Sequence, residues 1–138
     1  MNHDAQAIVI EFCAAWDRSD SEAVLSYLAP DIVYQNVPLP TMYGKEEAGK
    51  FLLPLLKMAQ KIEFRLLSIA VSEAGDEVLT ERVDRLHFPQ GVVDIPLMGI
   101  FKIRQGKIAE WRDYADNAST MAAFTNIGID LTAAPSSR

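Results

Sequence analysis

The sequence of 138 residues has one cysteine, two histidines and no long uninterrupted apolar run, and each scarcity excludes a class of protein. Cys13 cannot form a disulfide within the chain, and the apolar helical pattern around it predicts a buried thiol. His3 and His87 are too few and too scattered for a zinc site, and we expect neither a metal nor another cofactor. No segment approaches membrane-spanning length, and the N-terminus lacks the basic start and apolar stretch of a signal peptide. We therefore expect a soluble cytoplasmic protein.

Basic residues are also scarce relative to acidic ones. Lys and Arg number 13 against 19 Asp and Glu, which gives a net charge of −6, and no cluster of Lys or Arg is present. This balance disfavours nucleic acid and anionic membranes as partners, because both reward clustered positive charge. The length fits one domain. We expect a single α+β domain over residues 1–131, followed by a flexible tail over residues 132–138.

The first third of the chain has the pattern of helices. Ile8, Phe12 and Trp16 recur every four residues and predict a helix from about residue 4 to 17. Residues 19–22 have the Ser-x-x-Glu form of a capping box, which predicts a second helix through Leu28. A third helix should follow Gly44, with a kink or a late start because Pro54 lies inside its apolar pattern.

Most of the remaining chain has the pattern of strands. One short strand is expected before the third helix, and four longer ones after it are separated by turn signals; the ranges are 32–37, 62–71, 78–88, 92–103 and 108–116. A weak helix over residues 119–124 is expected to close the domain. This order predicts helices packed on one face of a strongly curved, mixed but mostly antiparallel sheet, which forms a cone-shaped pocket for a small ligand.

Strand alternation places several polar residues on shared faces, because residues i and i+2 point to the same side of a sheet. The sets that share a face are Arg82, Asp84 and Leu86; Trp111, Asp113 and Ala115; Tyr34 and Asn36; and Ile95 and Leu97. If all four faces line the concave side, they form a chamber with two carboxylates, a guanidinium, a phenol and an amide. The pattern alone favours solvated ion pairs on an exposed face, an aromatic of the core or rim at Tyr34 and a turn-forming Asn36.

At these same residues the sequence resembles the limonene-1,2-epoxide hydrolase family, within the nuclear-transport-factor-2-like and polyketide-cyclase-like superfamily. The matching pieces are Tyr34-Gln35-Asn36-Val37-Pro38-Leu39-Pro40, Glu81-Arg82-Val83-Asp84, Met98-Gly99-Ile100-Phe101, Gly106-Lys107-Ile108 and Trp111-Arg112-Asp113-Tyr114. The last strand is shared loosely with other members of the superfamily, whereas Arg-x-Asp together with Tyr-x-Asn is far more discriminating. With all five polar positions present, the resemblance favours an enzyme.

The resemblance implies a role for each polar residue. Asp113 would be the general base that takes a proton from water, and Tyr34 and Asn36 would hold that water. Asp84 would be the general acid that protonates the epoxide oxygen, and Arg82 would bridge the two carboxylates. The product would be a vicinal trans-diol, formed in one step without a covalent intermediate. Two nearby carboxylates in an apolar pocket suit this chemistry, because they resist ionising together and so supply one acid and one base.

The expected substrate is a small apolar epoxide, cyclic or substituted with an aryl group. The sheet would supply four apolar residues to the walls of its pocket: Leu86, Ile95, Leu97 and Ala115. The helices could add Leu55, Trp16 and Cys13, although plain core packing is the simpler interpretation for each of these three. Ala115 stands where the family has a bulky aromatic, which predicts a wider pocket and puts limonene oxide in doubt as the preferred substrate.

Other functions remain open at this point. An isomerase or cyclase of the same superfamily would act by proton transfer and would not need Arg82 and Asp84 together. A non-catalytic domain that binds small ligands would tolerate loss of Asp84, and an interaction protein would expose apolar patches. The resemblance also implies a homodimer formed through the outer sheet face, with which the two-sided apolar character of residues 92–103 is compatible.

Overall fold

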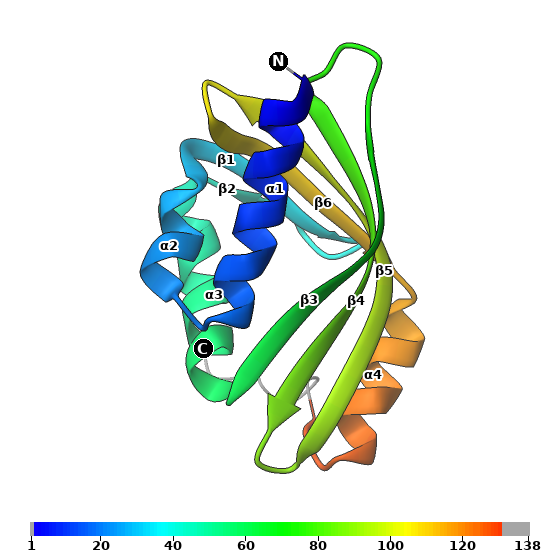
Figure 1. Cartoon of the computed structure of the whole chain (residues 1–138). Coiled ribbons are helices and arrows are strands. Elements are labelled where there is room, and N and C mark those ends of the chain that lie inside the picture. The colour runs from blue at the N-terminus through cyan, green and yellow to red at the C-terminus, as the bar shows by residue number, and fades with distance from the viewer. Residues whose placement is uncertain (1, 131–138) are drawn as a thin grey trace.

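A bent sheet with three helices on one side makes up most of the chain (Figure 1). The computed structural model describes residues 2–130, so the tail predicted over 132–138 lies outside the described part. The three helices are α1 (Asn2–Asp17), α2 (Ser21–Ser26) and α3 (Lys45–Met58). A fourth helix, α4 (Asn117–Asn126), packs against the fifth strand, and its Phe124 ring lies 5.6 Å from the ring of Phe88.

The sheet contains six strands in the order β2-β1-β6-β5-β4-β3. Their bounds are β1 (Leu28–Val37), β2 (Met42–Tyr43), β3 (Lys61–Val71), β4 (Glu77–Phe88), β5 (Gly91–Arg104) and β6 (Lys107–Ala115). All neighbours are antiparallel except β1 and β6, which run parallel. The predicted α+β class with a curved, mixed and mostly antiparallel sheet is confirmed.

Local chemistry explains where the elements differ from expectation. The cap of α2 is the carboxylate of Asp20, which accepts from the backbone N–H of Ala23, and not the predicted Ser19. The helix ends at Ser26, because Leu28 is buried as the first residue of β1. Pro54 lies within α3, and the helix neither starts late nor stops at it.

The predicted hairpin between β5 and β6 is present as a two-residue turn. Arg104 pairs with Lys107, and both central residues have positive φ, 53° at Gln105 and 77° at Gly106. Such turns match the right-handed twist of the flanking strands, and glycine adopts positive φ without a steric cost. The turn sets the register at its own end, and an irregularity between Lys102 and Ile103 then shifts the pairing, so that Gly99 lies opposite Asp113.

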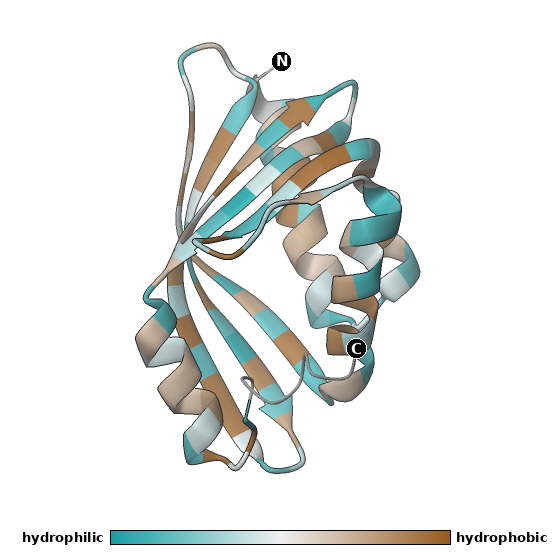
Figure 2. Ribbon diagram, turned by 180° about the vertical axis from the view of Figure 1, so that it is seen from behind, coloured by the Kyte–Doolittle hydropathy of each residue, from teal (hydrophilic) through white to brown (hydrophobic). Residues whose placement is uncertain are grey.

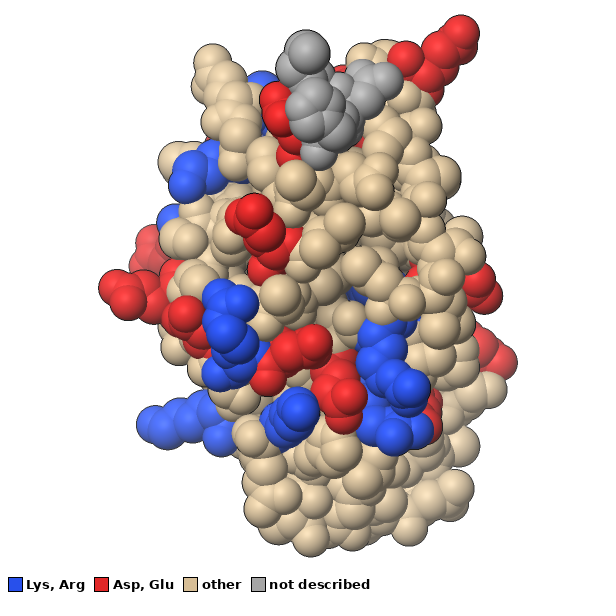
Figure 3. Space-filling model, viewed as in Figure 1, with Lys and Arg blue, Asp and Glu red and all other residues tan. Residues whose placement is uncertain are grey.

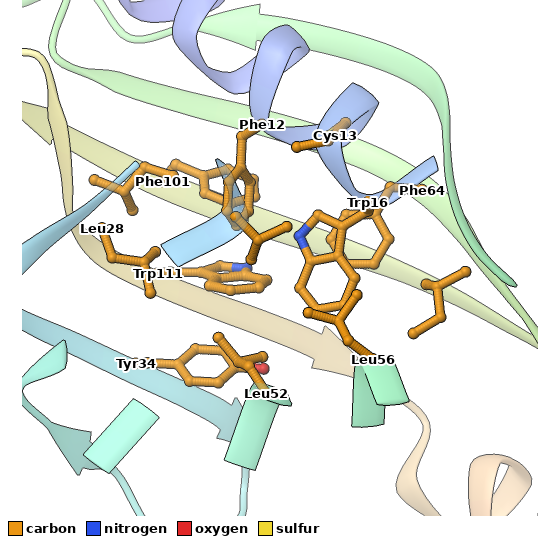
Figure 4. Packing of buried hydrophobic residues seen from close by; sticks show 14 of the residues in the cluster. Phe12, Cys13, Trp16, Leu28, Tyr34, Leu52, Leu56, Phe64, Phe101 and Trp111 are labelled. Atoms are coloured by element: carbon orange, nitrogen blue, oxygen red, sulfur yellow. The ribbon is translucent and has the colours of Figure 1, made fainter. Parts of the chain in front are cut away.

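The core lies between α1, α3 and the concave face of the sheet (Figure 4). On α1 the buried stripe is centred on Val9, Phe12 and Trp16, with Ile8 at its edge. Leu52 and Leu56 point inward from α3 toward this cluster. The aromatic side chains of this cluster fill the space between α1 and the sheet.

Apolar and polar residues alternate along much of the sheet (Figure 2), as expected where one face of a sheet is buried and the other is exposed. Acidic and basic side chains are interspersed on the face shown in Figure 3, so that face carries no extended basic surface of the kind that nucleic acid requires. None of the helices in the described part is long and apolar enough to cross a membrane.

Candidate active site

Strand register brings three polar residues and a glycine from four strands into one row across the concave face. Thr80 on β4 lies opposite Gly99 on β5, Gly99 opposite Asp113 on β6, and Asp113 opposite Asn36 on β1. The contact between Asp113 and Asn36 depends on the parallel pairing of β1 with β6, which are far apart in the sequence. The four faces singled out from alternation therefore do converge on the concave side.

Arg82 is at the centre of the site, fully buried at 0% exposure, and it bridges two carboxylates. Its Nε and Nη2 donate to the two oxygens of Asp84, both at 2.9 Å, and Nη2 also donates to Oδ2 of Asp113 at 2.9 Å. Burial lowers the pKa of Arg82, but the charges of Asp113 and Asp84 outweigh it and raise that pKa above its ordinary value. The guanidinium stays charged and fixes both carboxylates through its planar fork.

Asp113 is held from two sides. Oδ2 accepts from Arg82, and Oδ1 accepts from the indole Nε1 of Trp111 at 2.8 Å. A carboxylate has about four acceptor positions, so lone pairs remain for a water molecule. The side chain is thus oriented and still able to accept a proton.

Tyr34 and Asn36 lie beside Asp113 as a hydrogen-bonded pair. Nδ2 of Asn36 donates to the phenol oxygen of Tyr34 at 3.1 Å, which leaves the Tyr34 O–H group and the Asn36 carbonyl oxygen available. Burial, together with the charge of Asp113, raises the pKa of Tyr34, so the phenol stays neutral. The pair can offer both a donor and an acceptor to water.

Asp84 is the carboxyl group best suited to hold a proton. Burial raises its pKa to about 6, against the opposing charge and hydrogen bonds of Arg82. The other titratable groups facing the cluster include Cys13 on α1, whose pKa burial raises to about 12. An acid that is partly protonated near neutral pH is what general acid catalysis requires.

The raised pKa of Asp84 predicts that stability falls with increasing pH. The folded chain binds a proton at Asp84 that the unfolded chain, with an ordinary pKa of 3.8, has already lost. Ionisation of Asp84 should therefore lower the free energy of unfolding as pH rises from about 4 through 6, by at most about 3 kcal/mol. Urea unfolding at pH 5 and pH 8 measures this, with Asp84→Asn as the control that lacks the titration. A wild-type difference between the two pH values no larger than that of the control would contradict it.

Aromatic rings enclose the cluster on two sides. The guanidinium of Arg82 lies 4.5 Å from the ring centre of Phe64, which stacks on Trp16 at 4.5 Å. On the other side, Trp111 stacks between Phe101 at 5.4 Å and Tyr34 at 4.3 Å. These rings exclude water from the ion pairs, which strengthens every charge interaction among them.

The residues predicted to form the apolar walls of the pocket are all buried or half-buried, but they lie in different parts of the fold. Leu86 and Leu97 are buried on the concave face, and Ile95 and Ala115 are half-buried there. Cys13 and Trp16 belong to the core stripe of α1, and Leu55 is only half-buried on α3, where Leu52 and Leu56 point inward instead. His87 lies on the opposite side of β4 from Asp84 and bonds to Glu63 at 2.7 Å.

Two residues of the site escaped the sequence interpretation. Thr80 is fully buried and accepts a hydrogen bond from Arg82, and Gly99 lies between Thr80 and Asp113 in the polar row. Both left a signal: alternation places Thr80 on the face of Arg82 and Asp84, and an isolated glycine inside a strand indicates a close approach. Among residues 2–130, no group of three His, Cys, Asp or Glu side chains could hold a metal ion.

Comparison with known proteins places this geometry in a family. The family model described as the limonene-1,2-epoxide hydrolase catalytic domain matches residues 3–126. Epoxide hydrolase EphG of Mycobacterium tuberculosis is 30% identical over 105 residues, which are 76% of this chain and 68% of that protein.

Solved structures agree on the fold. A limonene-1,2-epoxide hydrolase-like epoxide hydrolase of M. tuberculosis has a TM-score of 0.75 at 28% identity, covering 91% of this chain and 87% of the other. The epoxide hydrolase/cyclase-like enzyme SalBIII, described with pyran ring formation in the polyether salinomycin, has a TM-score of 0.77 over 86% of this chain and 97% of its own. Its 14% identity supports the shared fold alone.

Proposed function

The chain belongs to the limonene-1,2-epoxide hydrolase family, and from that premise we propose that it adds water to small apolar epoxides to give vicinal trans-diols in one step. Membership supports epoxide hydrolysis in general. The single observation that carries the mechanism is the buried guanidinium of Arg82, which holds Asp84 and Asp113 in one cluster. One cation offsets the charge of only one of the two buried carboxylates, which favours a proton on the other. The cluster then contains one carboxylic acid and one carboxylate, the acid and the base that the reaction needs.

Asp84 protonates the departing epoxide oxygen in this mechanism. An epoxide is strained, but its leaving group is an alkoxide, and proton transfer as the C–O bond breaks removes that obstacle. The raised pKa of Asp84 supports this role, since the acid must be protonated near the working pH. Activity that depends on this proton is lost as pH rises through the pKa of Asp84.

Asp113 takes the proton of the attacking water, and Tyr34 with Asn36 positions that water. The register that sets Asn36 opposite Asp113, together with the bond between Asn36 and Tyr34, supports a water site shared by the three side chains. Attack from the side opposite the departing oxygen inverts the attacked carbon. The proton that Asp113 gains and the one that Asp84 loses leave the cluster with unchanged charge, and exchange with solvent restores both groups.

The substrate is a small, largely hydrocarbon epoxide. Leu86 and Leu97 are apolar walls next to the carboxylates, and Leu97 pairs with Ala115 across β5 and β6. The methyl group of Ala115 leaves more space than an aromatic ring would at this position. Since aromatic rings fill the space between α1 and the sheet, we propose that the bulk of the substrate lies toward Ala115.

An oxygen-18 experiment tests the one-step mechanism. With enzyme in excess over cyclohexene oxide or limonene oxide in ¹⁸O-labelled water, a single turnover should put label in the diol and none in the protein. Mass spectrometry of the diol and of the protein measures both. Unlabelled diol with label in a protein carboxylate would indicate a covalent ester and contradict direct attack by water.

The same experiment separates the main alternative. A cyclase would open the epoxide with a hydroxyl group of the substrate itself. This alternative is tested because the chain shares its fold with the epoxide hydrolase/cyclase-like enzyme SalBIII. Diol from none of a small panel of simple epoxides would shift the proposal to a cyclase, an isomerase or a binding domain.

We also propose that the chain forms a homodimer through the outer sheet face. Leu67, Met98 and Tyr114 are exposed there and, with Val83 and Pro96, line a shallow hollow. Exposed apolar groups gathered on one face are typical of protein interfaces. Sedimentation equilibrium distinguishes the dimer from a monomer. The cytoplasmic location stays a prediction from the sequence.

A further inference from the structure

The guanidinium of Arg82 has to cross a neighbouring strand to reach Asp113. Arg82 lies on β4 and Asp113 on β6, and β5 runs between them. The register places Thr80, Gly99 and Asp113 in one row and Arg82, Leu97 and Ala115 in the next. The side chain of Arg82 therefore runs diagonally from its own row into the row of Gly99.

The absence of a side chain at Gly99 leaves the space in which Arg82 reaches Asp113. A Cβ atom at Gly99 would lie 2.5 Å from Nη1 of Arg82 and closer still to Oδ1 of Asp113. Real Cβ atoms essentially never make contacts under 3.0 Å, so any side chain at position 99 would displace one of these groups. The groups next to the gap are buried and fixed by other bonds, and neither can move without losing a partner.

Thr80 fixes the far side of the guanidinium. Its hydroxyl donates to the backbone carbonyl of Gly99 at 3.0 Å, so a lone pair is left to accept from Nη1 of Arg82 at 3.2 Å. Nε and Nη2 are taken by the carboxylates, and Thr80 supplies the partner for Nη1. Thr80 is fully buried, so water cannot replace its hydroxyl.

We propose that Thr80 and Gly99 are positioning residues for the hydrolysis: together they hold the Arg82 guanidinium in the one orientation that reaches both Asp84 and Asp113. The proposal rests on the function proposed above. Both act through Arg82. The hydroxyl of Thr80 blocks rotation of the guanidinium away from the carboxylates, and the missing side chain of Gly99 opens the path to β6.

Thr80→Val tests the hydroxyl at nearly constant volume, and Thr80→Ser is the rescue that keeps it. We expect Thr80→Val to lower kcat by about 10–100-fold, by analogy with the loss seen when the hydrogen-bond partner of a metal-binding side chain is removed, and to change KM little. Thr80→Ser should keep most of the wild-type rate. Equal losses in both variants would mean that the position is sensitive to any change of side-chain shape and not to loss of the hydroxyl in particular, which would overturn the proposal, as would a wild-type rate in Thr80→Val.

A substrate-free measurement separates this proposal from the function itself. The Arg82 guanidinium holds the pKa of Asp84 below the value that burial alone would give. A loosened guanidinium should therefore raise the pKa of Asp84 further, by about 0.5 or more in Thr80→Val. Carboxyl ¹³C NMR titration, assigned with Asp84→Asn, measures this without any epoxide. Tyr34 and Cys13, the other titratable groups facing the cluster, have raised pKa values and stay neutral over this range.

The two measurements have distinct outcomes. A chain that hydrolyses no epoxide but shows the expected change in the Asp84 titration would overturn the proposed function, and it would support only that Thr80 positions the guanidinium of Arg82. An unchanged titration in Thr80→Val, in a chain that hydrolyses epoxides, would overturn the positioning role alone.

Gly99→Ala is the harsher companion variant. It should lose more activity than Thr80→Val, because the added methyl group displaces Arg82 or Asp113 directly. Gly49→Ala on α3 is the matched control, since a Cβ there would meet its nearest atom, Cδ2 of Leu25, at an ordinary 3.7 Å. A folded and fully active Gly99→Ala would overturn the role of the gap. If Gly99→Ala does not fold, the comparison of Thr80→Val with Thr80→Ser decides the proposal.

Discussion

Asp84→Asn and Asp113→Asn each lose about 10²–10⁴-fold in kcat while the chain keeps its fold, because each removes one of the two proton transfers in the proposed step. The amide of asparagine has the shape of the carboxylic acid, so it fits the same space, although its NH2 group cannot accept and one hydrogen bond from Arg82 or Trp111 is lost. It can neither give the epoxide oxygen an acidic proton nor take one from water. Diol formation from cyclohexene oxide measures the loss, and far-ultraviolet circular dichroism checks the fold.

Asp94→Asn is the matched control for both variants. Asp94 also accepts two hydrogen bonds from an arginine, Arg85, but this pair lies on the exposed side of the sheet. The control should keep the wild-type rate. Substantial hydrolysis by either site variant would contradict the mechanism with two carboxylates.

Arg82→Met destabilises the fold by about 3–5 kcal/mol, the largest stability effect that we expect from a single polar side chain in this chain. The substitution keeps much of the apolar volume but removes the cation that bonds to both buried carboxylates. An uncompensated charge in a dry environment is costly, so the loss should be larger at pH 8 than at pH 5, where Asp84 can be neutral. Turnover should be lost as well.

Arg85→Met on the same strand is the control for that measurement. Arg85 binds Asp94 through Nε at 2.7 Å and Nη2 at 3.0 Å, much as Arg82 binds Asp84, but its side chain is 36% exposed. An exposed pair contributes about 0–1 kcal/mol, so this variant should unfold near the wild-type urea concentration. Equal losses in the two variants would mean that burial is not what makes Arg82 important.

Sequence alone predicted the fold class and every strand except the two-residue β2, because alternation and turn residues are local signals. It also placed Arg82, Asp84 and Asp113 on candidate faces. It did not place β1 beside β6 by any local signal, since parallel pairing leaves no hairpin to detect. The meeting of Asn36 with Asp113 depends on that pairing.

Thr80 and Gly99 show a second reason why sequence reasoning falls short. Leu55 posed a related difficulty, because it fits the apolar pattern of α3 as well as the buried Leu52 and Leu56 do, and it is only half-buried. Thr80 and Gly99 have ordinary local roles in a strand, and their importance comes from one diagonal side chain. Such an effect is visible only once the three-dimensional register is known.

The parallel pairing of β1 with β6 also has a consequence for the order of folding. Arg82 and Asp84 lie next to each other on β4, so half of the site can form as soon as the local hairpins around β4 do. The side chains on β1 that hold the water and the base on β6 meet only when the first strand pairs with the last. This pairing closes the longest loop in the sheet, and contacts between residues far apart in sequence are the slowest to form. Recovery of activity during refolding should therefore lag behind recovery of sheet structure, because no partly assembled chain has the complete site.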